Sequence, residues 1–62
     1  MKKIELAYRY ILNELMEKKR RNLTQAEIAR ALNISLSTVN LAISYLNKMN
    51  AVKVKRRSFD LV

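Results

Sequence analysis

The chain has 62 residues, half of them apolar, and its 13 Lys and Arg outnumber its five Asp and Glu, which gives a net charge of +8. This length corresponds to one small domain. The chain lacks Cys, His and Gly, so it has no disulfide, no histidine metal ligand or general base, and no glycine-rich phosphate loop. Since the five acids are scattered, we expect no enzyme, no metal site, no cofactor and no small-molecule ligand. The positive charge favours a polyanionic partner: DNA, RNA or anionic lipid.

The sequence shows no membrane segment. Its longest apolar runs, such as residues 41–43, are three residues long, whereas a membrane-spanning helix needs about 20 mostly apolar residues. Lys2 and Lys3 are followed by Glu5 and Arg9, which interrupt any secretory-signal pattern. We therefore expect a cytoplasmic protein.

Residues 2–21 are predicted to form a long amphipathic helix. Apolar side chains recur there at three- and four-residue steps, at Ile4, Tyr8, Ile11, Leu12, Leu15 and Met16. Three Glu residues stand four positions before a base, which supports the helix: Glu5 with Arg9, Glu14 with Lys18, and Glu17 with Arg21. Leu6 and Tyr10 lie off the main apolar stripe. We expect a homodimer contact there, because oligomerisation often supplements a core of this size.

Four consecutive bases, residues 18–21, end this predicted helix. Positive side chains interact favourably with the carboxyl end of a helix dipole, so one interpretation is a solvated helix end. The other interpretation is a patch that contacts phosphate groups.

A second helix is predicted over residues 25–32. Thr24 and Glu27 form the Ser/Thr-x-x-Glu capping box typical of a helix start. Asn33, which tolerates the left-handed conformation of a tight turn, stands where the helix ends.

A third helix is predicted over residues 36–48, after a three-residue turn. Ser35 is its expected N-cap, and Asn50 stands near its carboxyl end. Its apolar face is expected to comprise Val39, Ala42, Ile43, Leu46 and Met49.

Residues 51–62 are predicted to form a two-stranded hairpin. Val52 and Val54 alternate with Lys53 and Lys55, and Phe59 and Leu61 alternate with Ser58 and Asp60. The turn is expected near residues 55–57. Because the chain ends on apolar Leu61 and Val62, we expect Val62 not to be a natural terminus.

These elements predict a mainly α domain spanning residues 1–62, with a three-helix helix-turn-helix core and a two-stranded wing. Residues 24–39, TQAEIARALNISLSTV, resemble the winged helix-turn-helix family of DNA-binding domains, which is common among bacterial and archaeal transcription regulators. Residues 46–52, LNKMNAV, resemble the end of the family's recognition helix and the entry to its wing.

The resemblance implies a double-stranded DNA-binding domain, either a transcriptional regulator or the amino-terminal DNA-reading part of a longer protein. The third helix would then enter the major groove and the basic hairpin would contact phosphates. Gln25 and free amides at the start of the second helix would hold another phosphate. The implied contact residues are Gln25, Ser37, Thr38, Asn40, Leu41, Ser44, Tyr45, Lys48, Lys55, Arg56 and Arg57.

Two other functions fit the sequence. Leu36, Leu41 and Tyr45 stand in a helix whose exposed face is poor in charge, and an apolar ridge formed by them would suit a protein-interaction module. RNA binding through shape and phosphate contacts is the other alternative. The hairpin bases also have a second explanation, since charged residues protect an edge strand from aggregation.

Overall fold

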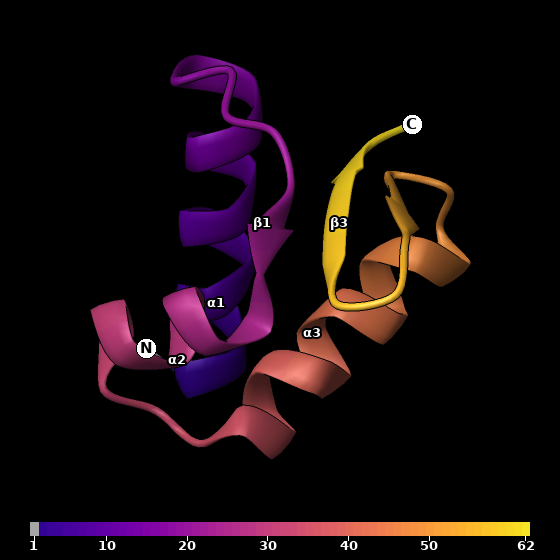
Figure 1. The fold of residues 1–62 in the computed structure, drawn as a ribbon. Helices are drawn as coiled ribbons and strands as arrows, with labels where there is room; N and C mark the ends of the chain where they lie inside the picture. The colour runs from indigo at the N-terminus through magenta and orange to yellow at the C-terminus, as the bar shows by residue number, and fades with distance from the viewer. Residues whose placement is uncertain (1) are drawn as a thin grey trace.

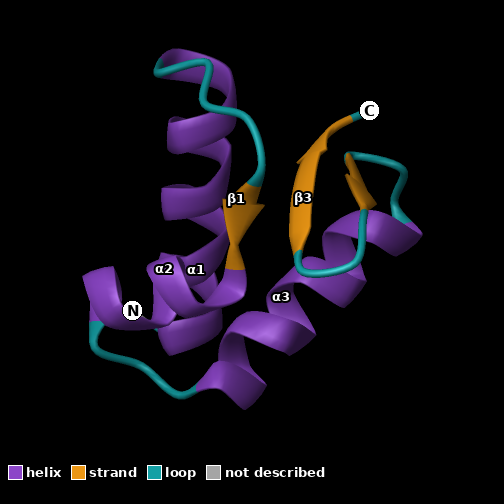
Figure 2. Ribbon diagram, viewed as in Figure 1, coloured by secondary structure: helices purple, strands orange, loops and turns teal. Residues whose placement is uncertain are grey.

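The structure is a computed structural model that describes residues 2–62. Its described elements are α1 (Lys3–Leu12), the π-helical segment η1 (Asn13–Glu17), β1 (Leu23–Thr24), α2 (Gln25–Leu32), α3 (Leu36–Lys48), β2 (Val52–Val54) and β3 (Ser58–Leu61). Figure 1 shows α1 upright, α2 beside its lower end, α3 slanting away from it, and the sheet between them. Figure 2 shows that most of the chain is helical. The predicted fold class, a mainly helical domain compatible with a winged helix-turn-helix, is confirmed.

The predicted bounds of α2 and α3 are confirmed, and side-chain caps start both helices. The Thr24 hydroxyl accepts a hydrogen bond from the Glu27 N–H at 3.2 Å. The Ser35 hydroxyl accepts one from the Thr38 N–H, also at 3.2 Å. Each cap satisfies an amide that would otherwise lack a partner in the first turn.

Two asparagines end these helices in place of glycine. Asn33 and Asn50 have φ angles of 54° and 62°, in the left-handed region. The following N–H groups turn back onto the helices: Ile34 donates to the Ala29 carbonyl at 3.1 Å, and Ala51 donates to the Leu46 carbonyl at 2.9 Å. Both are Schellman motifs. The α2–α3 turn is therefore fixed by hydrogen bonds.

The prediction that the first helix continues to Arg21 is wrong. The helical path widens into η1 and ends at Glu17, where the Lys18 N–H donates to the Asn13 carbonyl at 3.1 Å. Lys19 then adopts a φ of 54°. The predicted Glu14–Lys18 ion pair is confirmed, at 2.9 Å. Glu17 and Arg21, which the structure describes, form no ion pair, because Arg21 lies beyond the helix and not one turn from Glu17.

The predicted two-stranded hairpin, β2 and β3, is confirmed, and a third strand that was not predicted, β1, extends it. The sheet order is β1-β3-β2, and β3 pairs antiparallel with both neighbours. Leu23 lies opposite Phe59 in one pair of strands, and Val54 lies opposite Phe59 in the other. Since β1 leads directly into the Thr24 cap of α2, the third strand ties the wing to the helix-turn-helix unit.

The core lies between the three helices and the sheet. Its buried apolar side chains are Ala7, Ile11, Leu15, Leu23, Ile28, Val39, Ala42, Ile43, Leu46, Val52 and Phe59. Met16 and Met49, which the sequence placed on apolar faces, are 56% and 59% exposed. Met16 lies beside the buried stripe of Ala7, Ile11 and Leu15, and Met49 follows the last residue of α3.

Candidate nucleic-acid interface

The outer face of α3 brings together five of the eleven residues predicted to contact DNA. Val39, Ala42, Ile43 and Leu46 turn the opposite face into the core. Ser37, Leu41, Ser44 and Lys48 recur at steps of four, three and four residues and are exposed, so they form one stripe along the helix. Asn40 is also exposed and flanks this stripe. These five side chains form a surface about three turns long, which we call the α3 face.

The hydroxyls of Ser37 and Thr38 take part in the cap of α3. The Ser35 hydroxyl lies 2.8 Å from the Thr38 hydroxyl and 3.1 Å from the Ser37 hydroxyl. Thr38 is half-buried, whereas Ser37 is exposed. A hydroxyl both donates and accepts, so Ser37 retains hydrogen-bonding capacity toward a ligand. Thr38 contacts Ser35 through both its N–H and its hydroxyl, so its main role is in the cap of α3.

The predicted apolar ridge of Leu36, Leu41 and Tyr45 is divided. All three are exposed, at 56%, 62% and 52%. Leu36 and Leu41 are separated by about 140° around a helix that turns by about 100° per residue. Leu36 lines a shallow groove on the α2 side. Tyr45 instead stacks against Tyr8 of α1, with ring centroids 5.5 Å apart and tilted by 40°. Leu41 is thus the one apolar residue among the five of the α3 face, and Tyr45 lies one turn further along the helix at the edge of that face.

The hairpin turn carries three bases, of which Lys55 is paired with an acid and Arg56 and Arg57 are not. The Lys55 N–H closes the turn by donating to the Ser58 carbonyl at 2.7 Å, and its ammonium lies 3.2 Å from the Asp60 carboxylate. Arg56 and Arg57 are exposed at the tip, and neither forms an ion pair within residues 2–62. The wing therefore presents its two guanidinium groups to solvent.

A comparison with protein families agrees with this geometry. A family model described as an HTH domain matches residues 8–58, from α1 into β3. The chain belongs to the helix-turn-helix domain family. The domain architecture is one that places a recognition helix in the DNA major groove, so membership supports DNA binding. No curated protein matches the sequence.

The basic segment that follows η1, residues 18–21, has a structural role in this helix-turn-helix domain. Glu14 is only 3% exposed, and its two carboxylate oxygens lie 2.9 Å from Lys18 and 2.9 Å from Arg20. These hydrogen bonds, that from Lys18 first and that from Arg20 second, hold the pKa of the Glu14 carboxyl below its usual value. Arg20 also pairs with Glu27 of α2. Arg20 thus joins η1, through Glu14, to the first turn of α2, through Glu27. This contact was not predicted from the sequence.

Gln25 is the first residue of α2 and is half-buried. The predicted phosphate site at this helix start is reduced, because the Glu27 N–H is already bonded to Thr24. The Glu27 carboxylate also places a negative charge in the first turn, where Arg20 balances it. Gln25 is therefore a neutral hydrogen-bonding group at the start of α2.

The described part of the helix-turn-helix domain, residues 2–62, contains no group of three or more Asp, Glu, His or Cys arranged to hold a metal ion. Within the same residues, no helix combines the length and the apolar character needed to span a membrane.

Proposed function

We propose that this helix-turn-helix domain binds double-stranded DNA through the α3 face and acts in transcription regulation. The observation that carries the proposal is the exposed stripe of Ser37, Leu41, Ser44 and Lys48, polar at three of its four positions. It lies on the second helix of the helix-turn-helix unit, which is the recognition helix of this architecture. The stripe begins at the capped amino end of α3, which is the end that reaches base edges in this architecture.

Each residue of the α3 face has a chemically suitable partner in the major groove. The Asn40 amide can donate to and accept from one adenine, the commonest bidentate pairing for this side chain. Leu41 suits the methyl group of thymine, and Ser37 and Ser44 suit a base or a phosphate. Lys48, one helical turn beyond Ser44, suits a backbone phosphate. Thr38 and Tyr45 flank the face and contribute to its shape.

The wing and the start of α2 complete the proposed contact surface. Arg56 and Arg57 would bind phosphates or the minor groove, because they are exposed at the hairpin tip. Lys55 would add to this field more weakly, since Asp60 already offsets its charge. Gln25 would donate to a phosphate on the other side of α3.

A homodimer is part of the proposal. Leu6 is 37% exposed on α1, whereas Tyr10 is half-buried against the core, so Leu6 is the better candidate for a dimer contact. Two copies would read the two halves of a palindrome. Sedimentation of the wild type and of Leu6→Glu, with and without duplex, tests this point. A monomer on DNA would remove the dimer from the proposal.

The test of DNA reading is selection from a randomised duplex pool, followed by fluorescence anisotropy on the enriched site. We expect Asn40→Ala to lose about 1–3 kcal/mol of discrimination at one base position. Asn13→Ala, which removes the same side chain from an exposed position at the start of η1, is the matched control and should bind like the wild type. Absence of any enriched sequence would refute specific reading and direct the search to protein partners of Leu41.

A further inference from the structure

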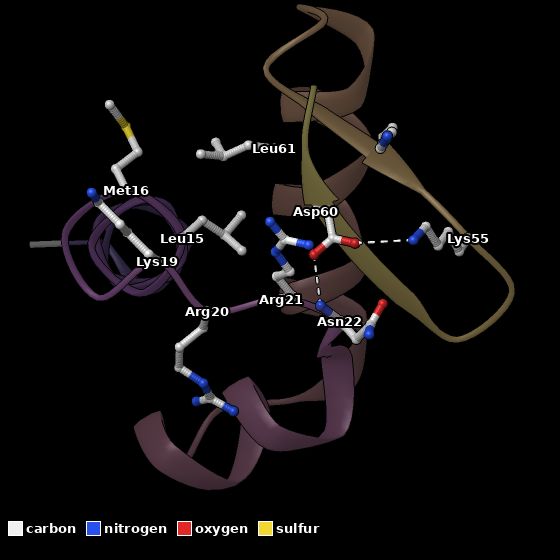
Figure 3. A pocket seen from close by; sticks show the side chains of 10 residues that line it. Leu15, Met16, Lys19, Arg20, Arg21, Asn22, Lys55, Asp60 and Leu61 are labelled. Carbon is white, nitrogen blue, oxygen red and sulfur yellow. Dashed lines mark hydrogen bonds and ion pairs between the residues drawn. The ribbon is translucent and has the colours of Figure 1, made fainter.

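A second cationic surface lies on the outer side of the sheet. An open hollow of ≈ 630 Å³ lies between the segment that follows η1 and strands β2 and β3. Figure 3 shows the side chains that line it. Of the ten residues that line it, five are Lys or Arg and one is a carboxylate, Asp60. The bases are Lys19, Arg20, Arg21, Lys53 and Lys55.

This hollow is separate from the α3 face. Lys53 and Asp60 are cross-strand partners, and alternate side chains of a strand point to opposite sides of a sheet. Their neighbours Val52 and Phe59 are buried in the core that includes α3. Lys53 and Asp60 therefore line the hollow from the side of the sheet that faces away from the core, and Leu61 lines it at the end of β3. None of the ten lining residues belongs to α3, so the hollow and the α3 face can be occupied together.

Hydrogen bonds hold the two walls of the hollow in place. The Asn22 N–H donates to one Asp60 carboxylate oxygen at 2.6 Å, and the Lys55 ammonium lies 3.2 Å from the other. Figure 3 shows both contacts meeting at Asp60. The carboxylate is thus engaged by the fold, and it joins the segment after η1 to strand β3.

Several lining cations are not used by the fold. Arg20 points out of the hollow toward α2, where it pairs with Glu27, whereas Arg21 points into the hollow (Figure 3). Lys19, Arg21 and Lys53 are exposed, and none of them forms an ion pair with the acids of residues 2–62. The hollow therefore offers three positive charges to a ligand.

The hollow also has an apolar side. Leu15 is buried at its wall, while Met16 is 56% exposed and Leu61 is 37% exposed. Burying such side chains against apolar groups of a ligand is favourable, and a sugar–phosphate backbone offers few apolar groups for this contact. A peptide that carries both carboxylates and apolar side chains matches both properties.

We propose that this hollow binds an acidic peptide segment of a partner protein. Carboxylates of the peptide contact Lys19, Arg21 and Lys53, and an apolar side chain of the peptide packs against Met16 and Leu61. The proposal does not depend on DNA binding, since none of the residues that line the hollow belongs to the α3 face.

The experiment is a fluorescence-anisotropy titration with a short labelled peptide in which Glu pairs alternate with single Leu residues. Arg21→Gln/Lys53→Gln should weaken binding about tenfold, because two exposed charge contacts are lost. Lys2→Gln/Lys3→Gln changes the net charge equally at the far end of α1 and should weaken binding by no more than about twofold. Met16→Ser, an exposed position, should weaken binding about threefold.

The outcomes decide between the proposal and its alternatives. Equal weakening by the two double variants would mean that the peptide responds to net charge alone and would overturn the proposal. An unchanged affinity for Met16→Ser, or for a peptide with Ser in place of Leu, would overturn the apolar contact. If Arg21→Gln/Lys53→Gln weakened duplex binding and left peptide binding intact, the hollow would be a nucleic-acid surface. Circular dichroism of each variant confirms that the fold is retained.

Discussion

The hairpin tip offers the sharpest quantitative test of the proposed DNA contact. Arg56 and Arg57 are exposed and form no ion pair within residues 2–62, so each is available to one phosphate. Each phosphate contact releases counterions and contributes about −0.9 to the slope of log K against log salt. Replacing both arginines with Gln should therefore make the slope shallower by about 1.8. Across an approximately fourfold rise in salt concentration, the wild type should lose about 12-fold more affinity than the double variant.

The assay is duplex anisotropy at several salt concentrations, on both an enriched site and an unrelated sequence. Phosphate contacts carry no base information, so Arg56→Gln/Arg57→Gln should weaken both duplexes by a similar factor. Lys2→Gln/Lys3→Gln lowers the net charge by the same amount at the start of α1 and should change the slope much less. An unchanged slope in the arginine variant, or an equal change in the lysine control, would show that the wing does not contact phosphates.

Three further predictions concern stability. Phe59 lies on the central strand of the sheet and is 1% exposed, so Phe59→Ala should lower the free energy of unfolding by about 3–5 kcal/mol, as much as a core of this size supplies. Val54→Ala, at a 48% exposed position, should lower it by only about 0.5 kcal/mol. Urea unfolding measures both values. Hydrogen bonds from the Asn22 N–H and then Lys55 lower the pKa of Asp60, so its stabilisation is present above the unfolded-state pKa and is lost as pH falls through the folded-state pKa. Asp60→Asn should therefore flatten the acid side of the stability profile, and an unchanged profile would contradict the assignment. Lys19 has a φ of 54°, a left-handed conformation that strains any residue with a Cβ atom and does not strain glycine. Lys19→Gly should therefore raise the free energy of unfolding by about 0.5 kcal/mol, after the larger backbone entropy of glycine in the unfolded chain is subtracted. A lower free energy of unfolding in this variant would contradict the reasoning.

The elements with local signals were predictable from the sequence. The bounds of α2 and α3 agree with those predicted from their capping residues. Thr24 and Ser35 start the two helices, and Asn33 and Asn50 end them. Each signal acts through a hydrogen bond between near neighbours in the chain, as between Thr24 and Glu27. Such bonds do not depend on the rest of the fold.

The elements that depend on distant partners were not predictable in this way. Strand β1 has two residues, and it exists because Leu23 and Thr24 pair with Phe59 and Ser58 much later in the chain. Because the helical path ends at Glu17, Arg20 lies outside it and can pair with Glu27, seven residues further along the chain. Neither two-residue strands nor return contacts of this kind have a periodicity to detect.

The candidate site was predictable in its positions but not in its neighbours. Helical spacing identified the exposed residues of α3, including Ser37, Asn40 and Lys48, from the apolar residues on the opposite side. It did not reveal that Tyr45 stacks on Tyr8, because that contact depends on where α1 crosses α3. Exposure follows from one helix, whereas availability to a ligand depends on the elements packed beside it.

The same reasoning changes what the net charge of +8 means. Lys18, Arg20 and Lys55 are engaged by acids, so their charges are partly consumed by the fold. Six of the ten remaining bases fall into two groups: Lys48, Arg56 and Arg57 on the α3 face and at the hairpin tip, and Lys19, Arg21 and Lys53 around the hollow. A nucleic acid bound on one side cannot neutralise both groups. A salt slope much smaller than the total charge would therefore be the expected behaviour of a DNA-binding domain that keeps its second cationic surface for another anion.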